Sequence, residues 1–244
     1  MNATLENGIV LDRRYEILGI LGQGSFGTVY EARDRQVEEQ AGGGDPAAAR
    51  VAIKQMPAQS IIDCERQADV RTLLKHPAIP QILGFFTEDG NAYLVQERVV
   101  GWDLETVLVH QRGFLSEKTV IGWAIQLCQF LHYLHTHPHY PMIFRDMKPN
   151  NVMVDRADRL HVVDFGLARI YPPGFFQDPQ PPFEHFWRGL AIGTPGYSPP
   201  EQYEGYIRPQ SDLYALGATL HHLLTRHDPR GDPPASFVKA PVRS

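Results

Sequence analysis

The sequence predicts an α+β fold of two lobes, with a mainly antiparallel sheet in residues 1–99 and a mainly helical lobe in residues 100–244. Short β-branched and apolar runs separated by turn residues fill the first part, which is typical of antiparallel strands. In the second part apolar residues recur at the spacing of amphipathic helices. The length of 244 residues suits one large domain or two small lobes.

The strands of the first lobe are expected in residues 15–54, where the pattern is that of a meander. Residues 36–49 interrupt it, and their run of glycines followed by Asp-Pro indicates a solvated loop. One helix is expected over residues 60–75. Two further strands, residues 81–87 and 92–99, flank an Asp-Gly pair that is typical of a hairpin turn.

In the second lobe the apolar spacing predicts a long helix over residues 120–134. Short apolar runs at 151–154 and 160–163 predict two strands, and residues 171–187 form a loop rich in proline and aromatic residues. The helix expected over residues 211–224 is apolar on most sides, so we predict that it is the buried axis of this lobe.

Composition excludes several classes of protein. A net charge of −5 and a pI near 6.1 give no overall basic field for nucleic acid or an anionic membrane. Two cysteines outside any C-x-x-C pair argue against disulfide scaffolds and cysteine zinc sites, and favour a cytoplasmic location. The longest apolar runs are shorter than a transmembrane helix, so no membrane segment is expected.

A glycine-rich string occupies residues 22–29 and reads G-x-G-x-x-G-x-V, with Gly22, Gly24, Gly27 and Val29 at its fixed positions. Glycines allow a backbone to approach phosphates closely. The chain continues as a strand after this string, whereas a dinucleotide-binding fold would open a helix there. A Walker A loop is excluded because no Lys-Ser or Lys-Thr follows the last glycine.

Three further strings follow in order: Val-Ala-Ile-Lys at residues 51–54, Ile-Phe-Arg-Asp-Met-Lys-Pro-Asn-Asn at 143–151, and Asp-Phe-Gly at 164–166. With these motifs the chain resembles the eukaryotic-type protein kinase family, most closely its bacterial Ser/Thr branch, over nearly all of residues 15–225. The resemblance implies a two-lobed kinase-like fold with ATP and Mg²⁺ as cofactors.

The resemblance also assigns roles to single residues. Asp146 would accept the hydrogen of the substrate hydroxyl, with Lys148 at the γ-phosphate and Lys54 at the α- and β-phosphates. Asn151 and Asp164 would hold magnesium through oxygen atoms.

The same resemblance places the nucleoside. Backbone groups of Glu97 and Val99 would bind the adenine edge behind a gatekeeper Gln96, and Asp103 would reach the ribose. The base would lie between the apolar residues Val29, Ala52 and Met153, for which ordinary core packing is the alternative.

A lysine two residues after Asp146, together with Thr194 in the substrate-facing loop, resembles the Ser/Thr-specific pattern. We therefore expect a Ser/Thr protein kinase that acts on protein substrates. The alternative is a nucleotide-binding pseudokinase with weak or no turnover. Gln67 favours it, because it stands nine residues before His76, where the family carries the Glu that orients Lys54. Arg71, one turn on, is a second departure, and Glu65 is the nearest acid.

Other positions depart from the family pattern. Phe144 replaces the usual His, and an apolar ring there should pack against the Phe of Asp-Phe-Gly. Residues 165–193 contain no Ser or Thr, so we expect either constitutive ordering of this loop or an acidic residue, Asp178 or Glu184, beside Arg145.

The end of the second lobe also departs from the pattern. Asp212 matches a buried aspartate that anchors the catalytic loop. The tail after this residue does not read as the helices that end the family's second lobe, so we expect an incomplete lobe with Glu201 unpaired and apolar surface exposed.

Overall fold

The computed structural model describes residues 4–24, 27–40, 47–57, 74–172 and 192–231. It forms two compact units, Met1–Val99 and Val100–Ser244. The helix expected over residues 60–75, which includes Gln67 and Arg71, lies almost entirely outside the described residues. The α+β fold class is confirmed, with the sheet in the first unit and the long helices in the second.

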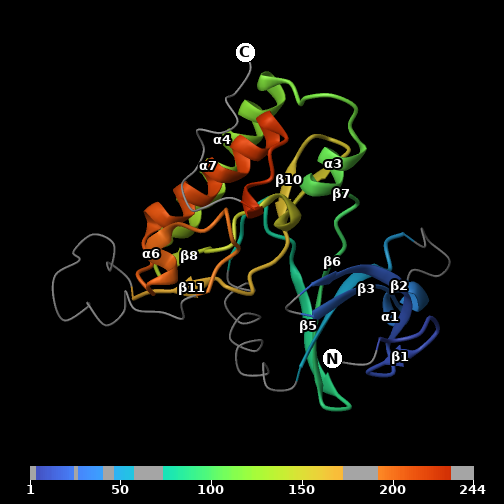
Figure 1. Cartoon of the computed structure of the whole chain (residues 1–244). Helices are drawn as coiled ribbons and strands as arrows, with labels where there is room; N and C mark the ends of the chain where they lie inside the picture. Colours follow the sequence, from blue (N-terminus) through green and yellow to red (C-terminus); the bar gives the residue numbers. More distant parts are fainter. Residues whose placement is uncertain (1–3, 25–26, 41–46, 58–73, 173–191, 232–244) are drawn as a thin grey trace. The chain divides into compact units, whose positions relative to one another are not determined.

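The first unit is built on one antiparallel sheet with the strand order β1-β2-β3-β4-β6-β5 (Figure 1). The strands are β1 (Val10–Leu11), β2 (Tyr15–Gly24), β3 (Gly27–Asp34), β4 (Arg50–Pro57), β5 (Ile82–Glu88) and β6 (Asn91–Glu97). The predicted meander and hairpin are both confirmed. Asp89 and Gly90, with φ values of 47° and 72°, form the two-residue turn that joins β5 to β6.

The start of the predicted loop 36–49 is instead a short helix, α1 (Arg35–Gln40). Asp34 explains it, because its Oδ1 accepts hydrogen bonds from the N–H groups of Gln36 (3.1 Å) and Val37 (3.4 Å). Burial alone would raise the pKa of Asp34, but the hydrogen bonds from Arg14 and from these N–H groups outweigh it, and the pKa is lowered. A capping aspartate thus makes helix out of residues whose composition predicts a loop.

The two faces of this sheet differ. One carries the main apolar core of the unit, made of Leu11, Tyr15, Ile17, Tyr30, Ala32, Val51, Ile53, Tyr93 and Val95. The other carries a smaller cluster of Met56, Ala92 and Leu94, with Ile82 and Phe85 packed against it. Because side chains alternate along a strand, Ile53 faces the main core while its neighbours Ala52 and Lys54 face the other side.

Gly27 opens β3 with a φ of 131°. A β-carbon at this position would lie 2.0 Å from the carbonyl oxygen of Gln55, so no side chain fits there without moving β4. We expect Gly27→Ala to lower the free energy of unfolding by more than about 1 kcal/mol in urea titrations. Gly22→Ala is the matched control, since nothing lies within 4 Å of a β-carbon there. Equal losses in the two variants would contradict this account.

The second unit contains two long helices, α4 (Glu117–His135) and α7 (Pro209–Thr225), which pack side by side (Figure 1). Ser116 caps α4 by accepting a hydrogen bond from the N–H of Thr119 (3.1 Å). The buried residues of α4 recur at helical spacing, as predicted: Val120, Trp123, Leu127, Phe130, Leu131 and Leu134. Much of α7 is buried too, although Leu213 is 54% exposed.

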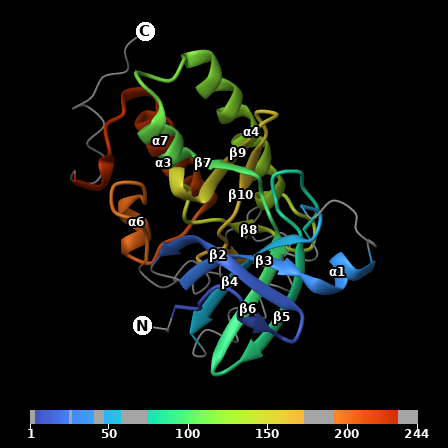
Figure 2. The same ribbon diagram turned by 90° about the vertical axis from the view of Figure 1, so that its right-hand side faces the viewer.

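Short elements complete this unit. A three-stranded sheet of β7 (Gly101–Asp103), β9 (Val152–Asp155) and β10 (Leu160–Val162) lies beside α3 (Leu104–His110) (Figure 2). The strands β8 (Met142–Ile143) and β11 (Arg169–Ile170) pair with each other, and η2 (Pro149–Asn151) precedes β9. The last elements include α6 (Pro200–Tyr203) and η3 (Pro229–Gly231). Within the described ranges, no helix has the length and apolarity needed to cross a membrane.

Candidate functional site

The sheet of the first unit brings together three of the predicted nucleotide-binding residues. Val29 lies directly opposite Lys54 on the neighbouring strand, and Ala52 stands two residues before Lys54. Cross-strand partners and residues two apart share a face, so the three side chains share one face of the sheet. Gly22 pairs with Val29, which joins the glycine-rich string to this group.

The predicted adenine-contacting residues lie at the end of β6. The N–H of Glu97 donates to the carbonyl of Gln81 (2.8 Å), the residue before β5, so this N–H already has a partner within the first unit. Gln96 is 8% exposed and lies opposite Ala52. Val99 is the last residue of the first unit.

In the second unit, Asp103 and Met153 lie opposite each other on β7 and β9. Asp103 is the N-cap of α3: its carboxylate accepts hydrogen bonds from the N–H (2.9 Å) and the hydroxyl (2.6 Å) of Thr106. This capping role was not predicted.

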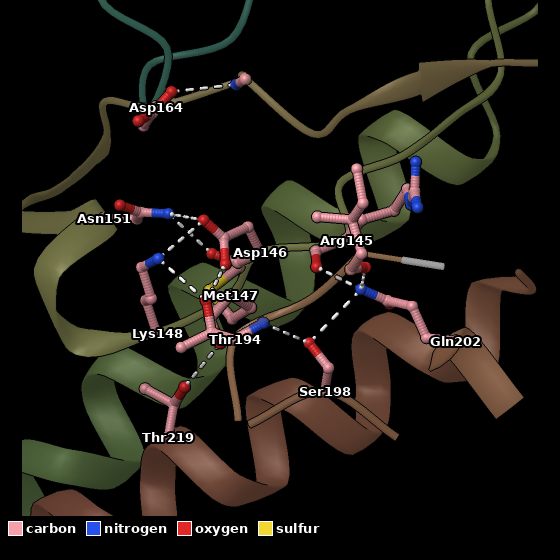
Figure 3. Close-up of polar contacts among 12 residues, drawn as sticks. Arg145, Asp146, Met147, Lys148, Asn151, Asp164, Thr194, Ser198, Gln202 and Thr219 are labelled. Carbon is pink, nitrogen blue, oxygen red and sulfur yellow. Dashed lines mark hydrogen bonds and ion pairs between the residues drawn. The ribbon is translucent and has the colours of Figure 1, made fainter. Parts of the chain in front are cut away.

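Asp146 is the centre of a hydrogen-bonded group in the second unit (Figure 3). It is 5% exposed, and its Oδ2 accepts hydrogen bonds from Lys148 Nζ (2.9 Å) and Asn151 Nδ2 (2.8 Å). Its Oδ1 accepts one from the hydroxyl of Thr194 (2.6 Å). Lys148 Nζ also donates to that hydroxyl oxygen (3.0 Å). A carboxylate, a cation and a hydroxyl are therefore in mutual contact.

The side-chain amide of Asn151 has a defined orientation. Its Nδ2 donates to both the backbone carbonyl (2.9 Å) and the Oδ2 (2.8 Å) of Asp146, and only an NH₂ group can face two acceptors. The amide oxygen consequently points away from Asp146, as Figure 3 shows. An oxygen held in this way suits a hard cation.

Asp164, the other predicted magnesium ligand, accepts a hydrogen bond at Oδ1 from the N–H of Gly166 (2.9 Å). Figure 3 shows it apart from the group around Asp146. Within the described residues, no three side chains of His, Cys, Asp or Glu are placed to hold a metal ion. A carboxylate and an amide oxygen still fit Mg²⁺, which commonly takes one or two protein ligands and completes its shell with phosphate and water.

Backbone anchors fix the loop that carries Asp146. Asp212 is fully buried on α7, and its carboxylate accepts hydrogen bonds from the N–H groups of Phe144 (2.8 Å) and Arg145 (2.7 Å) and from His135 Nε2 (2.8 Å). Thr219, further along α7, donates to the carbonyl of Met147 (3.1 Å). The structure thus bears out the predicted anchoring by Asp212.

Three aromatic rings pack around this loop. Phe144 and Phe165 meet edge to face at 5.3 Å between ring centroids, and Phe130 of α4 contacts both at 5.7 and 6.1 Å. All three rings are almost fully buried. The prediction that an apolar ring at residue 144 packs against the Phe of Asp-Phe-Gly is confirmed.

Arg145 is 6% exposed and donates to the carbonyl of Leu167 (3.4 Å). Burial lowers the pKa of Arg145 from its ordinary value. Tyr171, the only hydroxyl-bearing side chain of residues 165–193, is 2% exposed, and burial raises its pKa to about 12. Its hydroxyl is therefore not open to modification in this structure. Asp178 and Glu184 lie outside the described residues.

That Glu201 lacks the arginine partner of the family stays a prediction. Its carboxylate accepts a hydrogen bond from the hydroxyl of Ser211, the third residue of α7, at 3.2 Å. The tail from residue 232 lies outside the described residues.

Comparison with known proteins places this geometry in a family. Residues 15–237 match the family described as "Protein kinase domain". The chain belongs to the protein kinase domain family. Kinase-domain relatives include "Serine/threonine-protein kinase B" of Synechocystis sp., 31% identical over 238 residues that cover 92% of this chain and 39% of the relative.

Two further relatives have the same kind of name. "Serine/threonine-protein kinase PknA" of Nostoc sp. is 33% identical over 91% of this chain and 38% of the relative. "Serine/threonine-protein kinase PknB" of Mycobacterium tuberculosis is 31% identical over 96% of this chain and 36% of the relative. This kinase-domain chain therefore spans well under half the length of these relatives.

A buried histidine supports the loop of this kinase domain that carries Thr194. The Tyr197 hydroxyl and Nδ1 of His222 form a buried hydrogen bond of 2.7 Å, and burial raises the pKa of Tyr197. Burial lowers the pKa of His222, so the folded chain resists protonation there. Below about pH 6.5 the unfolded chain binds a proton that the folded chain does not, and stability must fall with pH.

We expect the free energy of unfolding to decrease from about pH 6.5 toward pH 5, and His222→Gln to remove part of that decrease. Urea titrations at a series of pH values measure it. His132→Gln, at an exposed position of α4, is the control. A pH dependence that is the same in wild type and His222→Gln would contradict the role given to His222.

Proposed function

We propose that this chain is the catalytic domain of a serine/threonine protein kinase, which transfers the γ-phosphate of ATP to a protein hydroxyl with Mg²⁺ as the cation. One observation carries the proposal: a threonine hydroxyl, that of Thr194, donates to Asp146 while Lys148 contacts both. A substrate hydroxyl would need the same acceptor and the same nearby positive charge.

In this proposal the first unit supplies most of the nucleotide contacts. Lys54 fixes the α- and β-phosphates by charge, and the glycine-rich string approaches them with its backbone. The shared face of Val29, Ala52 and Lys54 supports it, because one bound molecule can then contact all three. The remaining contacts are those assigned by resemblance, at Gly22, Gly24, Gly27, Glu97, Val99, Asp103 and Met153.

Asn151 and Asp164 hold the magnesium ion in this proposal. The amide of Asn151 supports it, since its NH₂ is bound to Asp146 and its oxygen is left to face a cation. The bound cation neutralises charge on the phosphates during transfer.

Asp146 accepts the proton of the substrate hydroxyl, and the hydroxyl oxygen forms its bond to phosphorus as the bond to the leaving oxygen breaks. Lys148 holds Asp146 Oδ2 and adds positive charge where the phosphoryl group passes. The Thr194 hydroxyl donates to Oδ1, and the second lone pair of that oxygen can accept the hydrogen of the substrate hydroxyl. The names of the relatives and the contact between Lys148 and Thr194 together favour serine and threonine over tyrosine.

A second candidate is a nucleotide-binding regulatory domain without turnover, which the neutral Gln67 favours. One experiment decides between the two. Purified chain is mixed with γ-labelled ATP, Mg²⁺ and a generic basic protein, and single-turnover transfer is followed with and without a chelator. We expect Mg²⁺-dependent label on serine or threonine; ATP binding with no transfer would support the regulatory domain instead.

A further inference from the structure

Gln202 of α6 joins two loops that the sequence does not connect. The residue is 1% exposed, and its Nε2 donates to the carbonyl oxygens of Arg145 (3.0 Å) and Ile192 (2.8 Å). Arg145 precedes Asp146 in the catalytic loop, whereas Ile192 leads into the loop that carries Thr194. Figure 3 shows the side chain of Gln202 pointing toward both loops.

The orientation of this amide is fixed by its partners. Two carbonyl oxygens face Nε2, and a flipped amide would set its own oxygen against both. An NH₂ group has two hydrogens, one for each carbonyl. The 3.3 Å contact of Nε2 with Ser198 Oγ is longer than both. Gln202 is therefore a double donor that no apolar or acidic side chain replaces.

Ser198 lies between Gln202 and Thr194 and forms hydrogen bonds with Thr194. Its Oγ accepts a hydrogen bond from the N–H of Thr194 (2.9 Å), and its own N–H donates to the Thr194 carbonyl (3.0 Å). Packing is close here as well, because a β-carbon on Gly193 would lie 2.3 Å from Ser198 Oγ and 2.9 Å from Gln202 Nε2. Both main-chain polar groups of Thr194 are thereby held.

The other end of the connection is the strained backbone of Arg145. With a φ of 71° it lies in the left-handed region, which a non-glycine residue keeps only where surrounding contacts hold it. Asp212 binds its N–H, and Gln202 binds its carbonyl. The carbonyl of Arg145 belongs to the peptide group that precedes Asp146, and Gln202 holds this group by a hydrogen bond.

We propose that Gln202 is a positioning residue, which sets the Thr194 hydroxyl against Asp146 by holding the two loops in register. The proposal rests on the proposed function, since it names the residue that aligns the hydroxyl-binding part of that site. Gln202 touches no reacting atom. Replacing Gln202 should therefore slow phosphate transfer to a protein hydroxyl and leave ATP binding unchanged.

The test uses Gln202→Met, which keeps the length of the side chain and removes both donors. We expect kcat for the protein substrate to fall by about 10- to 100-fold, while the KM for ATP stays unchanged. The same Gln→Met change at Gln210, which is exposed on α7, is the matched control. Gln202→Glu, which places acceptors against the two carbonyls, should be at least as damaging as Gln202→Met.

A double-mutant cycle separates positioning from general support of the fold. In a Thr194→Ala background there is no hydroxyl to position, so Gln202→Met should cause much less than its single-variant loss. Losses of Gln202→Met and Thr194→Ala that simply multiply would overturn the proposal. So would a rise in the KM for ATP equal to the fall in kcat.

Amide hydrogen exchange provides a readout that needs no catalysis. Exchange at the N–H groups of Thr194, Tyr197 and Ser198 should become faster in Gln202→Met, with no change in the sheet of the first unit. Unchanged exchange in residues 192–198 would overturn the positioning role. A wild-type chain that transfers no phosphate would instead overturn the proposed function, and the exchange result would still decide on Gln202.

Discussion

Asp146→Asn should yield a protein that binds ATP with wild-type affinity but transfers its γ-phosphate at least about a hundredfold more slowly. The carboxylate has two acceptor oxygens, and both are used. Oδ2 takes hydrogen bonds from Lys148 and Asn151, and Oδ1 takes one from Thr194. An asparagine offers one oxygen and one NH₂ group.

The orientation of that asparagine follows from its neighbours. Lys148 and Asn151 present only donors, so the oxygen must turn toward them and the NH₂ group toward Thr194. A hydroxyl on that side then has no acceptor for its hydrogen. The variant keeps the shape of the site and loses the base, so the effect should appear in the transfer step.

The measurement is single-turnover transfer together with an ATP titration by fluorescence or calorimetry. Asp89→Asn is the matched control, since Asp89 is a turn residue of the first unit with a φ of 47°, a conformation that asparagine also adopts. Transfer by Asp146→Asn at the wild-type rate would refute the role of this carboxylate. Loss of ATP binding would show that the substitution acts on the fold instead.

The elements that the sequence predicted well are those with a strong local pattern. The β5–β6 hairpin follows from an Asp-Gly turn between apolar runs, and α4 from apolar residues at helical spacing. The error at α1 has a local cause too. Asp34 caps that helix, and composition alone does not tell a capped turn of helix from a loop.

The candidate site also has a part that the sequence predicted and a part that it did not. Asp146, Lys148 and Asn151 are close in sequence, and their motif predicted that they act together. Gln202 and Ser198 were missed, because their partners lie in other loops and α6 is too short to show a periodic pattern. The burial of Gln202, which is 1% exposed, is known only from the structure. The spacing of residues in the sequence does not predict contacts that depend on the path of a loop.

Asp212→Ala should have the largest effect on stability, a loss of about 3–5 kcal/mol in the free energy of unfolding. The carboxylate is fully buried and accepts from three donors: the N–H groups of Phe144 and Arg145 and the ring of His135. Alanine removes the acceptor of two buried N–H groups and of the partly buried ring of His135, and each buried donor left without an acceptor costs about 1–3 kcal/mol. Asp212→Asn keeps one oxygen and should lose less.

Urea unfolding curves of Asp212→Ala and Asp212→Asn measure both losses, with Glu204→Ala as an exposed control. An unchanged slope with denaturant would show that the change lies in stability. Phosphate transfer should fall further than the folded fraction explains, because the left-handed backbone of Arg145 loses the acceptor of its N–H and can relax, moving Asp146. A stable Asp212→Ala variant would mean that the loop before Asp146 is held by its aromatic packing and by Gln202 and Thr219, and not by this carboxylate.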